Sequence, residues 1–556
     1  MKTRVIVIAT FAAMLAVGWW YGRPAYRHYK EMRLVPQAQA FLQKREYPKA
    51  WLSVRQIFAL NPTNVPACRI MADLAELGHS PQTLVWRRKV AELEPTIDNR
   101  LVLASCALRF ENPPFPLASK TLENLAPDAN QNPAFHVVSA ERAIKLNQLA
   151  EAEAHLLEAG RLEPTNQLHQ LNVTVLRLES PDPKTVSEAR TRLEAFIPDL
   201  QYGIVALRSL AAEALNRKDF PTAERFSSQV LANTNSTFND RLQHLDILRG
   251  VESGSQPNPA YQSHFATLQR TASTNLAEIY ELATWLNRRE LSSEALTWLA
   301  SLAPTVRTQA PVPVLIADCY MLKKDWPTLE NWLREQKWGD QEFLRLAILS
   351  RALRNQGETN VATINWNRAV HAASEKADLL AALLRVAQGW GWAAEAEELL
   401  WQVAKQFPDE HWAVQLLEKN YLEARNTAGL FKVYSAMNRV APKDLLVKNN
   451  LATICLLLKT NTIQAHQFAS EVYAQYPTNS AVATTYAFSL YIQGKTTEGL
   501  AALTKLPVQE LQQPSTAAYY AVLLSAAGDA VQAEKYAAFA TRAPLLPEEA
   551  ALLRIK

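Results

Sequence analysis

The sequence predicts an all-α protein, a right-handed solenoid of about 15 helical hairpins with an N-terminal transmembrane helix and a C-terminal capping helix. Three observations predict it: a period of about 34 residues along the chain, a glycine count of only 15 in 556 residues, and one uncharged stretch near the N-terminus. Glycine is normally about 7% of a protein, and its scarcity leaves few positive-φ turns for β-hairpins or nucleotide-binding loops. The balance of 58 basic and 54 acidic residues gives a net charge of +4, which indicates no broad nucleic-acid-binding field.

The first element is the uncharged run VIVIATFAAMLAVGWWY, 17 residues from Val5 to Tyr21. This length is at the short end of a membrane span, and the aromatic residues at its end suit the headgroup layer. We therefore expect residues 1–22 to be a retained membrane anchor or an uncleaved signal. The alternative is a leader cleaved after Ala16-Val17-Gly18, which would release a secreted protein.

Two features of the N-terminus disagree about the side of the membrane on which the body lies. Four basic residues follow the run within about one helix length, against two before it, and this count alone favours a cytoplasmic body. A short basic leader directly before an apolar run is, however, typical of export signals, and long domains translocate largely regardless of charge. We expect a single-pass protein of the cell membrane whose soluble part is extracytoplasmic.

The body consists of repeated segments with a small residue, apolar residues four and seven positions later, and often a proline twelve positions later. AEAHLLEAGRLEP from Ala152 to Pro164 and AEELLWQVAKQFP from Ala396 to Pro408 are clear examples. Offsets of four and seven lie on one face of a helix, and proline ends the helix. The small or anchor position recurs fifteen times at spacings of 33 to 38 residues, on average 34.5. The anchors are Ala50, Thr83, Ala118, Ala152, Ala189, Ala223, Tyr261, Ala295, Leu329, Ala362, Ala396, Leu430, Ala465, Gly499 and Ala533.

A second amphipathic helix precedes most anchors, so each unit is two helices and two short turns. In its period, its small anchor, its apolar residues and its closing proline, the chain resembles the tetratricopeptide repeat (TPR) family over about residues 31–545. The fit is poorest from Arg249 to Asn275, and Thr83, Tyr261, Leu329 and Leu430 replace the small anchor. We expect a TPR solenoid over residues 23–545 and a capping helix in 546–556, where Pro547 can start a helix.

No motif indicates catalysis, a cofactor or a metal site. The ten histidines form no His-Glu-x-x-His pattern, and neither a phosphate-binding loop nor a Gly-x-Ser-x-Gly motif occurs. The four cysteines are far apart and lie in apolar helical stretches, where we expect them to pack in the core. The fourteen tryptophans invite a sugar-stacking interpretation, but most occupy amphipathic helix positions that favour packing between hairpins. The sequence predicts a non-enzymatic protein without cofactors.

The resemblance implies that partners bind in a concave groove lined by the first helix of each hairpin, at positions eleven and fifteen residues before each anchor. The family's Lys and Asn pair for a C-terminal carboxylate is absent. Basic residues instead occupy the position eleven before the anchor in three consecutive repeats: Arg351, Arg385 and Lys419, with Arg354 one turn beyond Arg351. This ladder would bind carboxylates of a partner. The alternative is that these cations pair with local acids or are solvated.

We therefore expect a membrane-anchored scaffold that binds partner peptides or helices in its groove. Bacterial proteins that resemble it in layout take part in cell-envelope assembly, an analogy at the level of the fold. The alternatives are a secreted or envelope polysaccharide-binding TPR protein and a non-catalytic subunit of a glycosyltransferase-type complex. Repeats up to about residue 545 leave no room for a catalytic domain. The sequence does not identify the partner, the pathway or the oligomeric state, and we expect neither a nucleic acid nor a small-molecule substrate.

Overall fold

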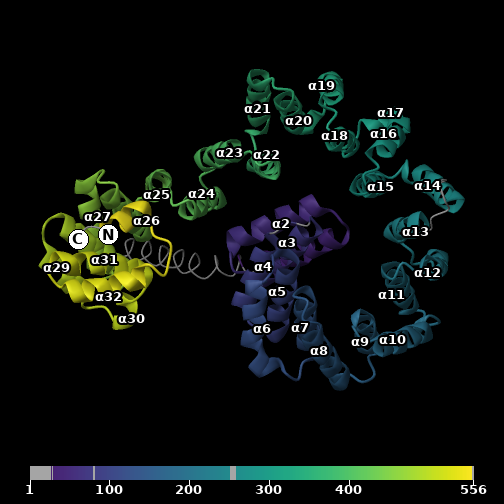
Figure 1. Ribbon diagram of the computed structural model, residues 1–556, viewed down its shortest axis with the longest axis horizontal. Coiled ribbons are helices and arrows are strands. Elements are labelled where there is room, and N and C mark those ends of the chain that lie inside the picture. Colours follow the sequence, from purple (N-terminus) through teal and green to yellow (C-terminus); the bar gives the residue numbers. More distant parts are fainter. Residues whose placement is uncertain (1–26, 28, 79, 81, 251–257, 554–556) are drawn as a thin grey trace, which may run out of the picture. The chain divides into compact units, whose positions relative to one another are not determined.

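A computed structural model describes residues 27, 29–78, 80, 82–250 and 258–553. Within these residues the secondary structure is entirely helical, with no strand (Figure 1). None of the helices in this described part combines the length and apolar character that a membrane crossing requires. The predicted anchor, residues 1–22, lies outside the described residues.

The chain divides into two compact units, of which the first ends at Leu282 and the second begins at Ala283. In the first unit residues 29–43 are helical and pair with α2, and later helices pair in the same way. The helices that follow are α2 (Tyr47–Leu60), α3 (Val65–Leu77), α4 (Gln82–Leu93), α5 (Ile97–Phe110), α6 (Pro116–Ala129), α7 (Pro133–Lys145), α8 (Leu149–Leu162), α9 (Gln167–Leu176), the 3₁₀ turn η1 (Arg177–Glu179), α10 (Pro183–Phe196), α11 (Gly203–Asn216), α12 (Phe220–Ala232), α13 (Phe238–Gly250) and α14 (Pro259–Ala272).

The boundary between the units falls inside α15 (Leu276–Arg288), and the second unit continues the alternation to the C-terminus. Two one-turn helices, α17 and α30, lie in the connections between hairpins. The helices are α16 (Ser292–Ser301), α17 (Pro304–Arg307), α18 (Val312–Lys323), α19 (Trp326–Glu335), η2 (Gly339–Gln341), α20 (Glu342–Asn355), α21 (Thr359–Ala373), α22 (Ala377–Gly389), α23 (Ala393–Gln406), α24 (His411–Glu423), α25 (Thr427–Val440), α26 (Leu445–Leu457), α27 (Thr462–Gln475), α28 (Ser480–Ile492), α29 (Thr496–Leu503), α30 (Val508–Leu511), α31 (Pro514–Ala526), α32 (Ala530–Ala540) and α33 (Pro547–Leu553).

The predicted hairpin period is confirmed helix by helix. Each of the fifteen anchors lies in the second helix of a hairpin, and in eleven of them it is the fourth residue of that helix. The prolines twelve residues after the anchors predicted the ends of these second helices. For example, α8 ends at Leu162, two residues before Pro164, and α23 ends at Gln406, two residues before Pro408. Consecutive helices pack on each other within hairpins, as α7 does on α8 and α20 on α21. First helices of neighbouring hairpins also touch, as α9 does α11 and α20 does α22.

The anchors are buried, as a close helix crossing requires. Fourteen of the fifteen are at most 9% exposed, including the larger Thr83, Leu329 and Leu430. The exception is Tyr261 in α14, which is half-exposed, whereas Leu268 and Ala272 are the buried residues of that helix. The structure therefore corrects the anchor assigned to Tyr261. Asn258 caps α14 and Pro259 starts it, and the buried residues of this helix begin only at Leu268.

The described part of the predicted C-terminal segment forms α33. It packs on α31, and Leu552 and Leu553 join the large hydrophobic cluster of the second unit. Glu549 accepts hydrogen bonds from the Tyr519 hydroxyl at 2.7 Å and from the backbone N–H of Leu546 at 2.9 Å, which satisfies a donor at the start of the helix. Thr427 of α25 also donates a hydrogen bond to Glu548.

Candidate groove on the first helices

The position eleven residues before the anchor identifies a cavity in the first unit. Counted back from Ala152, Ala189 and Ala223, this position is Glu141 on α7, Leu178 in η1 after α9, and Ala212 on α11. All three line one cavity of about 520 Å³. Most of the other lining residues also belong to α7, α9 with η1, and α11, which are first helices of three consecutive hairpins. These residues are Val137, Ala140, Ile144, Leu156, Asn172, Val175, Leu176, Glu179, Ser209, Glu213 and Asn216.

Both apolar side chains and carboxylates line the cavity. Ile144, one of the apolar residues that line it, is 45% exposed. Glu213 is nearly buried and receives Arg190 at 2.5 Å and Arg217 at 2.7 Å. Burial alone would raise the pKa of Glu213, but the hydrogen bonds from the two arginines outweigh it and hold the pKa below its ordinary value.

Two further carboxylates of the cavity have no counter-charge. Neither Glu141 nor Glu179 forms an ion pair among the described residues, and no Lys or Arg lines the cavity. The neighbouring arginines of the same hairpins are engaged with other acids: Arg142 with Glu151 at 2.5 Å, and Arg177 with Glu153 at 2.7 Å. The cavity therefore carries a net negative charge.

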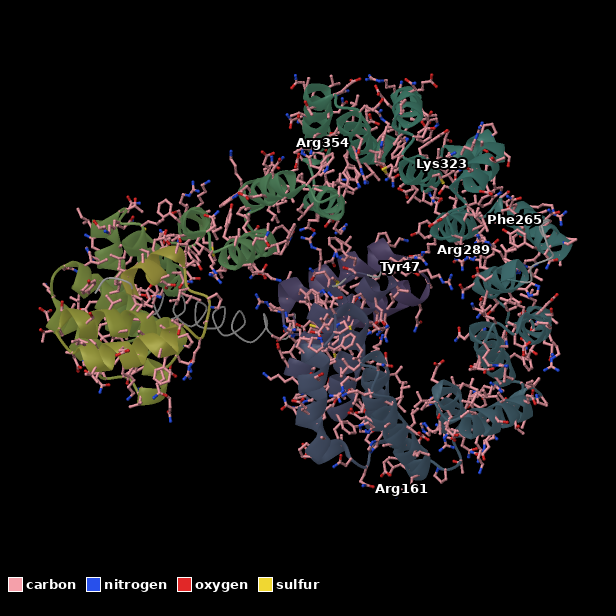
Figure 2. All side chains as sticks on the ribbon, in the orientation of Figure 1. Tyr47, Arg161, Phe265, Arg289, Lys323 and Arg354 are labelled. Carbon is pink, nitrogen blue, oxygen red and sulfur yellow. The ribbon has the colours of Figure 1, made fainter. Side chains whose placement is uncertain are left out.

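In the second unit, the structure places the predicted Arg351 and Arg354 in contact with aromatic rings. Both lie on α20, and Figure 2 labels Arg354. The Arg351 guanidinium is 4.8 Å from the centre of the Trp390 ring and 5.9 Å from that of Trp326, and burial lowers its pKa. The Arg354 guanidinium lies 3.8 Å from the centre of the Trp392 ring and pairs with Glu395 on α23 at 2.5 Å. Arg354 thus follows the alternative in which a cation pairs with a local acid.

The other two predicted groove residues are exposed. Arg385 on α22 forms no ion pair within the described residues, and Lys419 on α24 is 3.8 Å from Glu423, both side chains of that pair being 67% exposed. Arg351, Arg385 and Lys419 occupy the same register on consecutive first helices, as predicted, but no hydrogen bond or ion pair links them to one another.

Sequence reasoning missed Asp318, which occupies the same register one repeat earlier, eleven residues before Leu329. Asp318 lies on α18, and burial raises its pKa to about 6 while the charge of Arg351 opposes the shift. The register therefore reads Asp, Arg, Arg, Lys along four first helices. Counting back from one more anchor would have found it.

The tryptophans mainly fill space between helices, as predicted. Trp285, Trp298 and Trp366 are at most 5% exposed, and the tryptophans of α19 to α24 are half-buried against the hydrophobic clusters. Trp51 is the one exposed tryptophan among the described residues, and the Arg55 guanidinium lies 4.8 Å from its ring. The structure presents no row of open rings in the described part of the chain.

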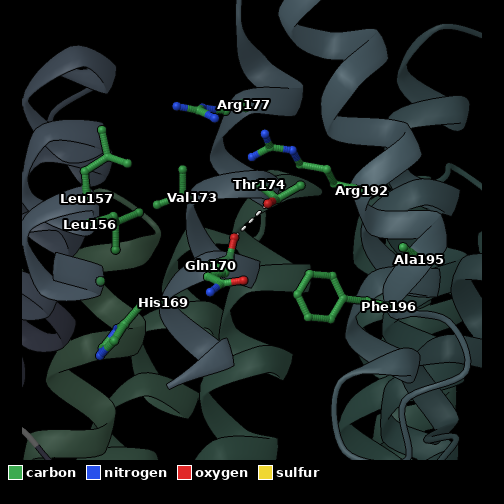
Figure 3. Close-up of a pocket in the computed structure, with 11 residues that line it drawn as sticks. Leu156, Leu157, His169, Gln170, Val173, Thr174, Arg177, Arg192, Ala195 and Phe196 are labelled. Carbon is green, nitrogen blue, oxygen red and sulfur yellow. Dashed lines mark hydrogen bonds between the residues drawn. The ribbon is translucent and has the colours of Figure 1, made fainter. Parts of the chain in front are cut away.

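A second cavity of about 490 Å³ lies between α8, α9 and α10 and is basic (Figure 3). In Figure 3 Arg177 and Arg192 lie above Thr174, with Leu156 and Phe196 on opposite sides of it. Arg192 is exposed and forms no ion pair within the described residues. This cavity and the cavity between α7, α9 and α11 carry opposite charges.

No group of three or more His, Cys, Asp or Glu side chains in the described residues is placed to hold a metal ion. The four cysteines are buried and free, and burial raises the pKa of Cys319 and of Cys455 to about 11. Histidines that the sequence left without a role form contacts within a hairpin, as between α7 and α8, and between neighbouring hairpins, as between α12 and α13. His136 and His155 are 3.0 Å apart through their Nδ1 atoms, and the Nδ1 atom of His244 is 2.8 Å from Ser227 Oγ.

Comparison with known proteins adds little beyond the helical architecture. No protein-family model matches the chain. No curated protein matches it either. Among solved structures, the crystal structure of the APC/C hetero-tetramer Cut9-Hcn1 aligns at 13% identity over 84% of this chain and 98% of that chain, with a TM-score of 0.27.

Proposed function

We propose that the chain is a non-enzymatic TPR scaffold that binds segments of partner proteins along the faces of its first helices. The observation that carries the proposal is the cavity between α7, α9 and α11, because the predicted groove register, Glu141, Leu178 and Ala212, lines it in three consecutive hairpins. Stacked helical hairpins present extended surfaces of this kind, and such surfaces serve binding. The hairpins and their connections also account for nearly the whole described chain.

The exposed cations Arg385 and Lys419 form the second part of the proposed binding face. They lie on consecutive first helices, and exposed cations in one register can bind carboxylates of an extended partner. Arg351 contacts the rings of Trp326 and Trp390, while Arg354 is paired with Glu395. We assign partner contact to Arg385 and Lys419 and positioning to Arg351 and Arg354.

The experiment is crosslinking of the full-length protein in its native cells, followed by mass spectrometry of the proteins that co-purify. The test variant is Arg385→Glu with Lys419→Glu. The matched control is Lys405→Glu with Lys432→Glu, which changes the same charges on α23 and α25, the second helices of the same hairpins. We expect a short reproducible set of partners that the test variant loses and the control keeps. Equal capture by all three proteins would contradict the proposed binding face.

We further propose that residues 1–22 anchor the scaffold in the cell membrane with its soluble part extracytoplasmic, in the manner of envelope-assembly proteins. The support is the uncharged run with its basic leader and its terminal aromatic residues. The full-length protein should remain in the membrane fraction after alkaline extraction. Its soluble part should be digested by protease added to cells whose outer envelope has been permeabilised. A variant lacking residues 1–22 should be soluble. Protection from protease until the membrane is lysed would place the body in the cytoplasm instead.

A further inference from the structure

We infer that the cavity between α7, α9 and α11 binds a basic segment of a partner protein in which apolar side chains are flanked by Lys or Arg. The inference rests on the proposed function, since it takes the first-helix face as the binding surface, and it adds the chemistry of the partner. It follows from the volume, the apolar lining residues and the unpaired carboxylates of this one cavity.

The apolar side chains that line the cavity are accessible to a partner. Val137 and Ile144 on α7, Val175 and Leu176 on α9, and Leu178 in η1 line it, and none of these five side chains is fully buried. Burying apolar surface favours binding by about 25 cal/mol for each Å² removed from water. A volume of about 520 Å³ is within the usual range of ligand sites and can hold a few apolar side chains.

The charge of the cavity selects the flanking residues of the partner. Glu213 is neutralised inside the chain by Arg190 and Arg217, but Glu141 and Glu179, which line the same cavity, have no ion-pair partner within the described residues. A carboxylate-bearing segment would be repelled by Glu141 and Glu179. Lys or Arg would gain a charge-assisted hydrogen bond to each free carboxylate.

The polar neutral groups of the cavity can bind a peptide backbone. Asn172, Ser209 and Asn216 line the cavity beside the carboxylates, and their side chains can donate to and accept from a peptide backbone. The neighbouring cavity between α8, α9 and α10 uses the same α9 but is lined by Arg177 and Arg192 without any carboxylate. We therefore expect the cavity between α8, α9 and α10 to favour acidic rather than basic ligands.

The test is fluorescence anisotropy of labelled synthetic peptides added to the purified full-length protein. The probe is a 16-residue peptide of Leu, Ala and Lys with an amphipathic pattern. Its two comparison peptides are the same pattern with Glu in place of Lys, and a scrambled order of the Lys peptide. We expect the Lys peptide to bind, the Glu peptide not to bind, and the scrambled peptide to bind more weakly.

The charge variant is Glu141→Gln with Glu179→Gln, which keeps the shape of the cavity. Exposed ion pairs contribute about 0.2–1 kcal/mol each, so losing two should weaken the Lys peptide by about 2- to 30-fold. The matched control, Glu123→Gln with Glu188→Gln, removes two exposed carboxylates from the second helices α6 and α10 and should leave the affinity unchanged. Ala212→Phe, which fills the cavity, should abolish binding while the helical circular dichroism signal stays intact.

Equal weakening by the control pair would mean that the peptide responds only to the total charge of the chain, and this would overturn the inference. So would binding of the Glu peptide, or binding of the Lys peptide that neither cavity variant alters. None of these three results would contradict the proposed scaffold function if the capture of crosslinked partners still depends on Arg385 and Lys419. The scaffold fails independently if crosslinking finds no partner for the full-length protein.

Discussion

Replacing Gly499 by alanine tests whether the small anchor residues permit the close helix packing. Gly499 is the fourth residue of α29 and faces both α28 and α31. A Cβ added at this position would lie 2.7 Å from Leu523 Cδ2 on α31 and 2.9 Å from the backbone oxygen of Ala487 on α28. Gly499 is thus the point where the hairpin partner and the next hairpin both approach α29.

The structure sets the size of the effect. Two carbon atoms pack best at about 3.5–4.0 Å, so the new methyl would be about 1 Å too close to Leu523. Leu523 is fully buried and the other contact is backbone, so neither neighbour can simply move aside. Overpacking of this kind costs about 1–3 kcal/mol, and alanine regains about 0.5–1 kcal/mol in a helix. We expect Gly499→Ala to lower the free energy of unfolding by about 1–2 kcal/mol.

The assay is urea unfolding followed by far-ultraviolet circular dichroism, with hydrogen exchange of α28, α29 and α31 to locate the loss. The control is Gly389→Ala at the end of α22, where an added Cβ meets nothing within 4 Å and should be neutral or stabilising. If Gly499→Ala proved as stable as the parent chain, the argument that small anchors are needed for close approach would be wrong.

Three further predictions concern buried titratable groups. Burial raises the pKa of Asp318 to about 6 from an ordinary 3.8, so the native state binds the proton more tightly than the unfolded chain does. The free energy of unfolding should therefore fall by up to about 3 kcal/mol as the pH rises between these two values. Asp318→Asn should remove this pH dependence, measured by hydrogen exchange of α18. Burial and the neighbouring His264 lower the pKa of His244 to about 4 from an ordinary 6.5. The free energy of unfolding should therefore fall by up to about 3 kcal/mol as the pH falls from 6.5 to 4. His244→Gln should remove this loss, measured as the urea midpoint at pH 5 and at pH 7. The four buried cysteines should take no maleimide label at pH 7 in the native chain and four labels in urea, and rapid labelling of the native chain would contradict their burial.

The hairpin period could be predicted because its signals are local. A small residue in the first turn of the second helix and a proline two residues after its end act within one hairpin, and both recur in the sequence without knowledge of the fold. Leu430 shows how a departure is accommodated. The residue before it is Gly429, where a Cβ would lie 2.4 Å from the Tyr421 ring, so the close approach has moved by one position. Tyr261 has no such substitute, and there the buried face of α14 starts later.

The site could be predicted only in part, because register is local and side-chain packing is not. The position eleven before the anchor does mark first-helix residues, and it lines the cavity of the first unit in three hairpins. Sequence reasoning followed charge and chose Arg351 and Arg354, which the fold stacks on Trp390 and Trp392. Whether a cation is free or covered depends on aromatic side chains contributed by the next hairpin, and no spacing along the helix reveals that.

The same register carries different chemistry in different hairpins. In α7, η1 and α11 it holds Glu141, Leu178 and Ala212, whereas in α22 and α24 it holds the exposed cations Arg385 and Lys419. A uniform array would bind one repeating ligand, whereas we expect a register that changes from apolar and acidic to basic to bind segments of opposite charge at different hairpins. The two variant pairs defined above should therefore act separately: Glu141→Gln with Glu179→Gln should affect only basic partners, and Arg385→Glu with Lys419→Glu only acidic ones. Loss of the same crosslinked partner from both would mean that one ligand spans both stretches of the array.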